Sequence, residues 1–154
     1  MTDYKHSDEI TALNTLTATT IDSVNGYRES AKNIDNEQLR TIFTQRASER
    51  EQVVQDLRGE VSRLGGNPED DGSFLGKTHQ LFEDLKAAVT GRDEQAIINE
   101  VERGEDYIKD KYETVLKSDV LGSECRIVVE KAFQSVRSGH DQISQMKHNM
   151  EATS

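Results

Sequence analysis

The chain has 154 residues with a formal net charge of −10, one cysteine, one proline and no tryptophan. This length fits a single domain over residues 1–154, with a core from about residue 8 to residue 147 and polar termini. A lone cysteine excludes an internal disulfide and a paired-cysteine zinc or redox site. The excess of acid argues against nucleic acid and anionic membrane surfaces as partners.

The sequence also favours a cytoplasmic protein built from long helices. No apolar run approaches the roughly 18 residues of a membrane span. The N-terminus, MTDYKHSDEI, lacks the basic start and the apolar stretch of a signal peptide. Proline makes up about 5% of an average protein and is excluded from helix interiors, so a single proline favours long helices.

Apolar residues first recur at helical spacing over residues 7–33 and again over residues 39–64. Ser7 is the predicted N-cap of the first helix, with Glu9 in its first turn. Asp35 is the predicted N-cap of the second helix, and Gly65 is expected to end it.

The second half of the chain continues the pattern. Residues 67–72 form an acidic loop that lacks the register of an EF-hand, so a solvated loop is preferred over a calcium site. A short helix is predicted over residues 73–89. A third long helix follows a cap at Asp93, and a fourth begins at Ser123, with a polar tail after Lys147 that is expected to fray.

These elements predict an all-α fold. Helices joined by short connections should form two antiparallel hairpins. A crossover helix of about 16 residues spans about 24 Å, enough to return the chain along a bundle, so the second and third long helices should run parallel. The arrangement predicted is a ferritin-like four-helix bundle: two hairpins joined by a long crossover that contains a short helix.

Di-iron bundles of this kind use Glu-x-x-His on two helices, because residues three apart share a helix face. The sequence contains no Glu-x-x-His. On a helical wheel of about 100° per residue, Glu29 lies nearly opposite the apolar stripe, and no carboxylate of the first helix faces inward. The pattern therefore gives no complete di-iron site.

A set of polar residues other than the di-iron ligands faces the predicted core. The topology places its members at roughly one height along the bundle axis. A buried arginine needs a carboxylate partner, and one acid in the set can supply it. A hydrogen-bonded ion pair inside the bundle is the preferred interpretation, and a small-anion site or a one-metal site at the Glu and His is the alternative. The set comprises Tyr27, Arg46, Arg50, Glu105 and His140.

The metal alternative needs more ligands than the wheel provides. A metal-dependent oxidoreductase or metal store would bind iron or another divalent transition metal through Glu105 and His140. It would also need ligands such as Glu29 and Glu49 turned inward against the wheel. Because the inward arginines repel cations, no cofactor is the preferred expectation.

Three glycines and the cysteine complete the candidate residues. Gly104 lies on an inward face in mid-helix, with Gly26 and Gly139 at comparable levels on other helices. A glycine there makes room, for close helix approach in the preferred interpretation or for a ligand cavity in the other. Cys125 lies near a helix start; a buried thiol is preferred over an activated thiolate.

Several segments resemble a known bacterial family, the ferritin-like four-helix bundles of domain of unknown function 2383. They are VNGYRESA (24–31), RAxxR (46–50), LGGNP (64–68), DLKAAVTG (84–91), ERGED (102–106) and HD (140–141). The resemblance spans nearly all of residues 8–147. It implies the bundle fold and a bacterial cytoplasmic setting without an assigned activity. Ferritin relatives suggest metal or oxidative-stress work, and the positions of Arg50, Glu105 and His140 match the family.

Three functions are carried forward. The first is a non-enzymatic, stress-related bundle that acts through protein or small-ligand contacts, because no complete catalytic constellation occurs. The second is the metal-dependent oxidoreductase or metal store described above. The third is a scaffold formed by a homodimer, on which the sequence gives no direct information.

Overall fold

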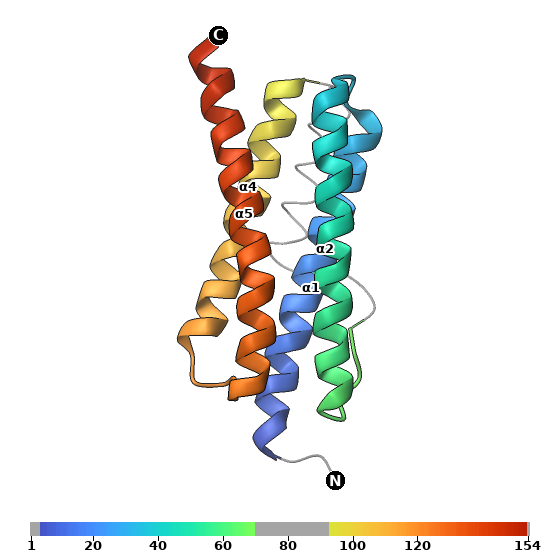
Figure 1. Ribbon diagram of the computed structural model, residues 1–154. Helices are drawn as coiled ribbons and strands as arrows, with labels where there is room; N and C mark the ends of the chain where they lie inside the picture. The colour runs from blue at the N-terminus through green and yellow to red at the C-terminus, as the bar shows by residue number, and fades with distance from the viewer. Residues whose placement is uncertain (1–3, 70–92, 154) are drawn as a thin grey trace.

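Four long helices make up the part of the chain that the computed structural model describes, residues 4–69 and 93–153 (Figure 1). They are α1 (Tyr4–Asn33), α2 (Glu37–Arg63), α4 (Glu94–Lys117) and α5 (Ser123–Thr153), and these two ranges contain no strand. The prediction of an all-α four-helix bundle is confirmed. The short helix predicted over residues 73–89 lies outside the described residues.

The four helices form a closed ring in which each neighbouring pair is antiparallel. α1 packs against α2 and α4, and α5 packs against α4 and α2. In Figure 1, α1 and α5 run upward while α2 and α4 run downward. The pairs α1–α5 and α2–α4 therefore face each other diagonally across the core, and members of each diagonal pair run in the same direction.

Helix boundaries follow local capping chemistry. The side chain of Asn36, and not that of Asp35, caps α2 by accepting a hydrogen bond from the Leu39 N–H at 3.0 Å. The Asp35 prediction is wrong by one residue, since both residue types suit this position. Gly65 ends α2 as predicted, with φ +85°, a conformation that glycine adopts without strain. Asp93 caps α4 as predicted.

Two predicted ends are wrong. Ser7 is not an N-cap, because α1 begins at Tyr4 and the Ser7 carbonyl already accepts a bond from the Thr11 hydroxyl. The tail after Lys147 remains helical to Thr153. The apolar side chains of Met146 and Met150 pack against the core there, so packing continues beyond the point at which the apolar stripe becomes weak.

A polar layer divides the apolar core into two clusters. One cluster fills the end of the bundle at which α1 begins, and the other fills the opposite end. The first is built around Leu13, Leu16, Val53, Leu57, Ile108, Tyr112, Val129 and Val136; the second around Tyr27, Ala31, Phe43, Ala47, Ile97, Ile98, Val101 and Ile143. Along α2, α4 and α5 the change from one cluster to the other falls at Arg50, Glu105 and Gly139.

None of these four helices is long and apolar enough to cross a membrane.

Candidate functional site

The polar layer centres on an ion pair between Arg50 of α2 and Glu105 of α4, hereafter the core ion pair. Arg50 Nη1 and Nη2 donate to the two Glu105 carboxylate oxygens at 2.7 and 2.6 Å. The side chains are 0% and 2% exposed. This two-bond geometry matches the planar guanidinium to the planar carboxylate. Because α2 and α4 lie on a diagonal, the pair crosses the middle of the bundle.

All four helices meet at the core ion pair. Arg50 Nη1 also donates to the Ser23 hydroxyl of α1 at 2.6 Å. On the side of α5, a Cβ placed on Gly139 would lie 2.5 Å from Arg50 Nη2 and 3.0 Å from Glu105 Oε2. Such distances are shorter than van der Waals contact, so the glycine lets the α5 backbone lie against the pair. The core ion pair thus fixes the axial position of each helix relative to the other three.

The electrostatics favour the ionised pair. Burial alone would lower the pKa of the Arg50 guanidinium, but the charge and hydrogen bonds of Glu105 more than offset this and raise it. Tyr27 covers Arg50, with its ring centre 5.7 Å from the guanidinium carbon. Burial, followed by the negative charge of Glu105, raises the Tyr27 pKa well above its ordinary range. Tyr27 therefore stays neutral beside the pair.

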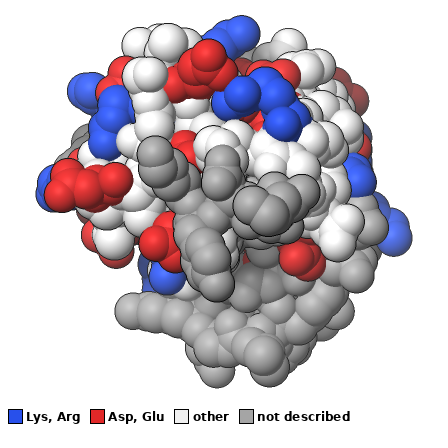
Figure 2. All heavy atoms as spheres, turned by 90° about the horizontal axis from the view of Figure 1, so that it is seen from below, with Lys and Arg blue, Asp and Glu red and all other residues white. Residues whose placement is uncertain are grey.

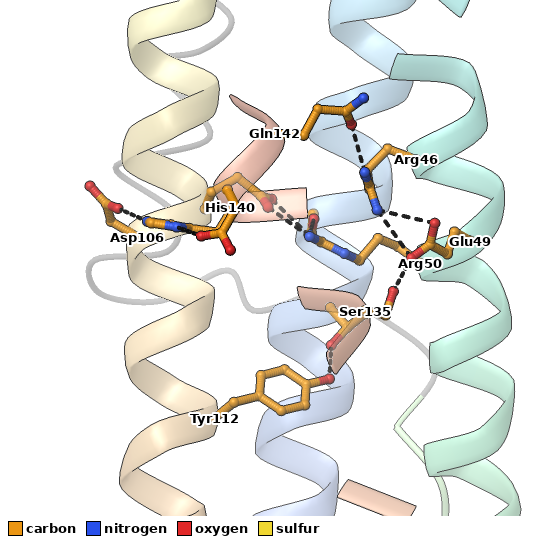
Figure 3. A network of polar contacts seen from close by, with 12 residues as sticks. Arg46, Glu49, Arg50, Asp106, Tyr112, Ser135, His140 and Gln142 are labelled. Carbon is orange, nitrogen blue, oxygen red and sulfur yellow. Dashed lines mark hydrogen bonds and ion pairs between the residues drawn. The ribbon is translucent and has the colours of Figure 1, made fainter. Parts of the chain in front are cut away.

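Arg46 lies at the rim of the layer, between α2 and α5 (Figure 3). It donates to both oxygens of Glu49 at 3.1 Å and to Gln142 Oε1 at 2.6 Å. Glu49 also accepts a hydrogen bond from Ser135 of α5. The inward direction predicted for Arg46 is present, but its carboxylate partner is the half-exposed Glu49 of its own helix.

Within the part of the chain that the structure describes, His140 forms no hydrogen bond with the core ion pair. Its Nε2 lies 2.6 Å from Asp106 Oδ1, and its Nδ1 lies 3.3 Å from Asp141 Oδ1. Figure 3 shows the ring directed toward Asp106 and away from Arg46. The wheel placed His140 near the inward face, and its side chain is only 15% exposed, but its ring pairs with two exposed aspartates at the α4–α5 contact and not with Arg50 or Glu105.

The four residues of the metal alternative are engaged separately. Glu105 binds Arg50, Glu49 binds Arg46, and Glu29 accepts a 3.4 Å contact from the Asn33 amide. Within residues 4–69 and 93–153, no three His, Cys, Asp or Glu side chains gather as ligands for a metal ion. The donor set expected for iron is thus dispersed over the described bundle.

The close helix approach preferred for Gly104 is not present among the described residues. No heavy atom of residues 4–69 or 93–153 would lie within 4 Å of a Cβ on Gly104, whereas the same atom on Gly139 would meet three side chains of the polar layer. The wheel placed Gly104 on the inward face, with Gly139 at a comparable level on its own helix. Gly104 precedes Glu105 and is only partly buried, so of these two glycines Gly139 is the one at which the polar layer comes close.

A second polar group, the end cluster, consists of Glu9, Glu60 and Cys125. Glu9 Oε2 accepts a hydrogen bond from the Gly122 N–H at 2.8 Å, just before α5. The Cys125 thiol donates to Glu60 Oε2 at 3.2 Å, and Arg63 binds the same carboxylate. Glu9, Glu60 and Cys125 are 6%, 9% and 1% exposed. The expectation that no carboxylate of the first helix faces inward is therefore wrong.

The end cluster could have been found from spacing. Glu9 precedes Leu13 by four residues and Leu16 by seven, and Glu60 follows Leu57 by three, so each shares a face with buried leucines. Ser23 and Gln142 carry no comparable signal, because a serine or a glutamine at such a position suits an exposed face equally well. Their roles depend on the arginines that reach them from α2.

Cys125 is expected to be unreactive in the folded protein. Burial, followed by hydrogen bonds to Glu9 and Glu60, raises its pKa, and the thiolate is the reactive form. A thiol reagent such as dithionitrobenzoate should modify the native protein only as fast as it opens, and unfolded protein at once. Rapid stoichiometric modification of native protein would contradict the preferred interpretation of an inert buried thiol.

Tyr112 should contribute to the alkaline limit of stability. Its hydroxyl shares a 2.8 Å hydrogen bond with Thr20, and burial raises its pKa to about 12. The unfolded chain loses this proton near pH 10, so the folded state binds more protons between the two values. The stability that Tyr112 contributes through its raised pKa is fully present below about pH 10 and is lost as the pH rises toward about 12.

The measurement is denaturant unfolding at a series of alkaline pH values. Tyr112→Phe should reduce the slope of unfolding free energy against pH without abolishing it, because the Tyr27 pKa is also raised. Tyr107→Phe is the control, since that side chain is partly exposed. Equal slopes for the parent and Tyr112→Phe would show that the Tyr112 hydroxyl does not set this limit.

The fold and the core ion pair define an all-α helical bundle with a polar middle layer. Residues 8–118, more than half of the chain, match the family model described as domain of unknown function (DUF2383). The chain therefore belongs to that family. No curated protein shows a significant match to it.

Proposed function

We propose that this protein is a ferritin-like bundle that catalyses no reaction and acts through contacts of its surface, in a bacterial cytoplasm and in a stress-related role. The core ion pair carries this proposal. The two terminal nitrogens of the Arg50 guanidinium, Nη1 and Nη2, donate to Glu105 and Ser23. A group already paired in the protein interior contributes to structure rather than offering an open site to a substrate or a metal ion.

The surface supports contacts of a polar kind. Seen from the end at which α1 begins, acidic and basic side chains lie next to one another on the described surface (Figure 2). Among the described residues, Ile127 is the large apolar side chain with high exposure, 67%. A single exposed apolar side chain gives little area for a permanent interface, so we infer a weakly bound protein partner or a second copy of the chain.

Metal analysis of protein purified without chelators tests the proposal, with turnover of peroxide and of oxygen measured on the same sample. We expect transition metal far below one ion per chain and no turnover above that of buffer. Near-stoichiometric iron or another divalent metal, lost in Glu105→Gln or His140→Ala but retained in the surface control Glu130→Gln, would favour the metal-dependent alternative instead.

A further inference from the structure

Two polar atoms beside the core ion pair are buried without a partner in full hydrogen-bond geometry among the described residues: the Tyr27 hydroxyl and Arg50 Nε. The Glu105 carboxylate lies close enough to the Tyr27 hydroxyl to contribute to its raised pKa, but that contact does not reach the geometry of a direct hydrogen bond. Tyr27 is 3% exposed and Arg50 is 0% exposed. Such groups are rare in folded proteins, because an unpaired buried donor loses its bonds to water without replacement. Their occurrence on two side chains in contact calls for a common explanation.

The chemistry of the two atoms restricts what could satisfy both. Arg50 Nε–H can only donate, whereas the Tyr27 hydroxyl can donate or accept. A shared occupant must therefore offer a lone pair to Arg50 and either a second lone pair or a hydrogen to Tyr27. The side chains are neighbours, with the Arg50 guanidinium carbon 5.7 Å from the Tyr27 ring centre, so a single small oxygen atom is the simplest occupant.

The charge of the layer argues against an anion as this occupant. Arg50 is already neutralised by Glu105 through two short bonds. An added anion would lie near the Glu105 carboxylate with no matching positive charge, which is strongly unfavourable in the interior. A neutral molecule with both acceptor and donor capacity fits better, because the Glu105 oxygens have lone pairs beyond the two that Arg50 uses.

We propose that one internal water molecule joins Tyr27, Arg50 and Glu105. Its oxygen accepts from the Tyr27 hydroxyl and from Arg50 Nε–H, and one of its hydrogens is donated to the Glu105 carboxylate. Three hydrogen bonds are typical of a buried water. The water makes Tyr27, from α1, part of the same hydrogen-bonded layer as the core ion pair and completes the bonding of the Arg50 guanidinium.

A high-resolution crystal structure tests the proposal directly. We expect density for a single water at hydrogen-bond distance, about 2.7–3.2 Å, from both Arg50 Nε and Tyr27 Oη. The absence of such density, a direct Tyr27–Glu105 hydrogen bond, or density for a larger molecule would each overturn it. None of these outcomes bears on whether the protein catalyses a reaction.

Tyr27→Phe gives a second test in solution. If the hydroxyl binds the water, its removal should raise the unfolding constant about five-fold, the usual effect of losing one hydrogen bond. Tyr112→Phe is the matched control, since that hydroxyl has a direct partner in Thr20 and should show a loss of similar size. A Tyr27→Phe variant as stable as the parent, or more stable, would indicate an unbonded hydroxyl and contradict the proposal.

Discussion

Replacing Glu105 with glutamine is expected to destabilise the protein by about 3–5 kcal/mol. Glutamine keeps the shape of the side chain but removes its charge, which leaves Arg50 buried at 0% exposure without a counter-ion. The loss is large because the unpaired charge stays buried, and this cost exceeds the energy of the lost hydrogen bonds. Denaturant unfolding followed by circular dichroism measures it, and the native spectrum shows whether the helices are retained.

Glu51→Gln is the matched control for this substitution. Glu51 also pairs with an arginine, Arg28, but both side chains are about half exposed, and water replaces a lost partner there. The expected loss is about 0–1 kcal/mol. If the Glu105 and Glu51 variants lost similar amounts of stability, the core ion pair would not be buried as described.

Gly139→Ala is expected to destabilise the protein by about 1–3 kcal/mol, the range for overpacking a core. The new Cβ would lie 2.5 Å from Arg50 Nη2. That atom cannot easily move away, because Glu105 holds it in the two-bond arrangement at 2.6 Å. Either α5 moves outward or the core ion pair is distorted, and thermal or denaturant unfolding detects both.

Gly104→Ala provides a control of the same chemical change. No heavy atom in the described part of the chain would lie within 4 Å of its Cβ, and alanine is a better helix former than glycine by about 1 kcal/mol. This variant should be slightly more stable than the parent, while Gly139→Ala should be less stable. The same sign of change for both would contradict the close approach of α5 to the pair.

The bundle could be predicted from the sequence because its signals are repeated in each element. Apolar residues recur with helical spacing in every long segment, and Gly65 and Asp93 mark boundaries by their own backbone chemistry. Where two adjacent residues suit the same role, as with Asp35 and Asn36, spacing cannot choose between them. The last turns of α5 depend on packing with residues distant in sequence, which a one-dimensional pattern does not contain.

The candidate site was predictable where burial follows from periodicity. Arg50 and Glu105 each replace an apolar residue in a stripe, so their pairing followed from the need to neutralise a buried charge. His140 lies at the edge of its stripe, where a small rotation decides between core and surface. Asp106 and Asp141 determine that rotation, and their influence depends on the packing of α4 against α5.

A double-mutant cycle on Arg50 and Glu105 tests most directly whether the core ion pair is a structural element that joins the two hairpins. The cycle compares Arg50→Met, Glu105→Leu and the double variant by denaturant unfolding. We expect each single variant to be strongly destabilised and the double variant to recover a large part of the loss, because it leaves no unpaired charge in the core. Losses that simply add, within about 0.5 kcal/mol, would contradict a coupled pair and the structural role inferred from it.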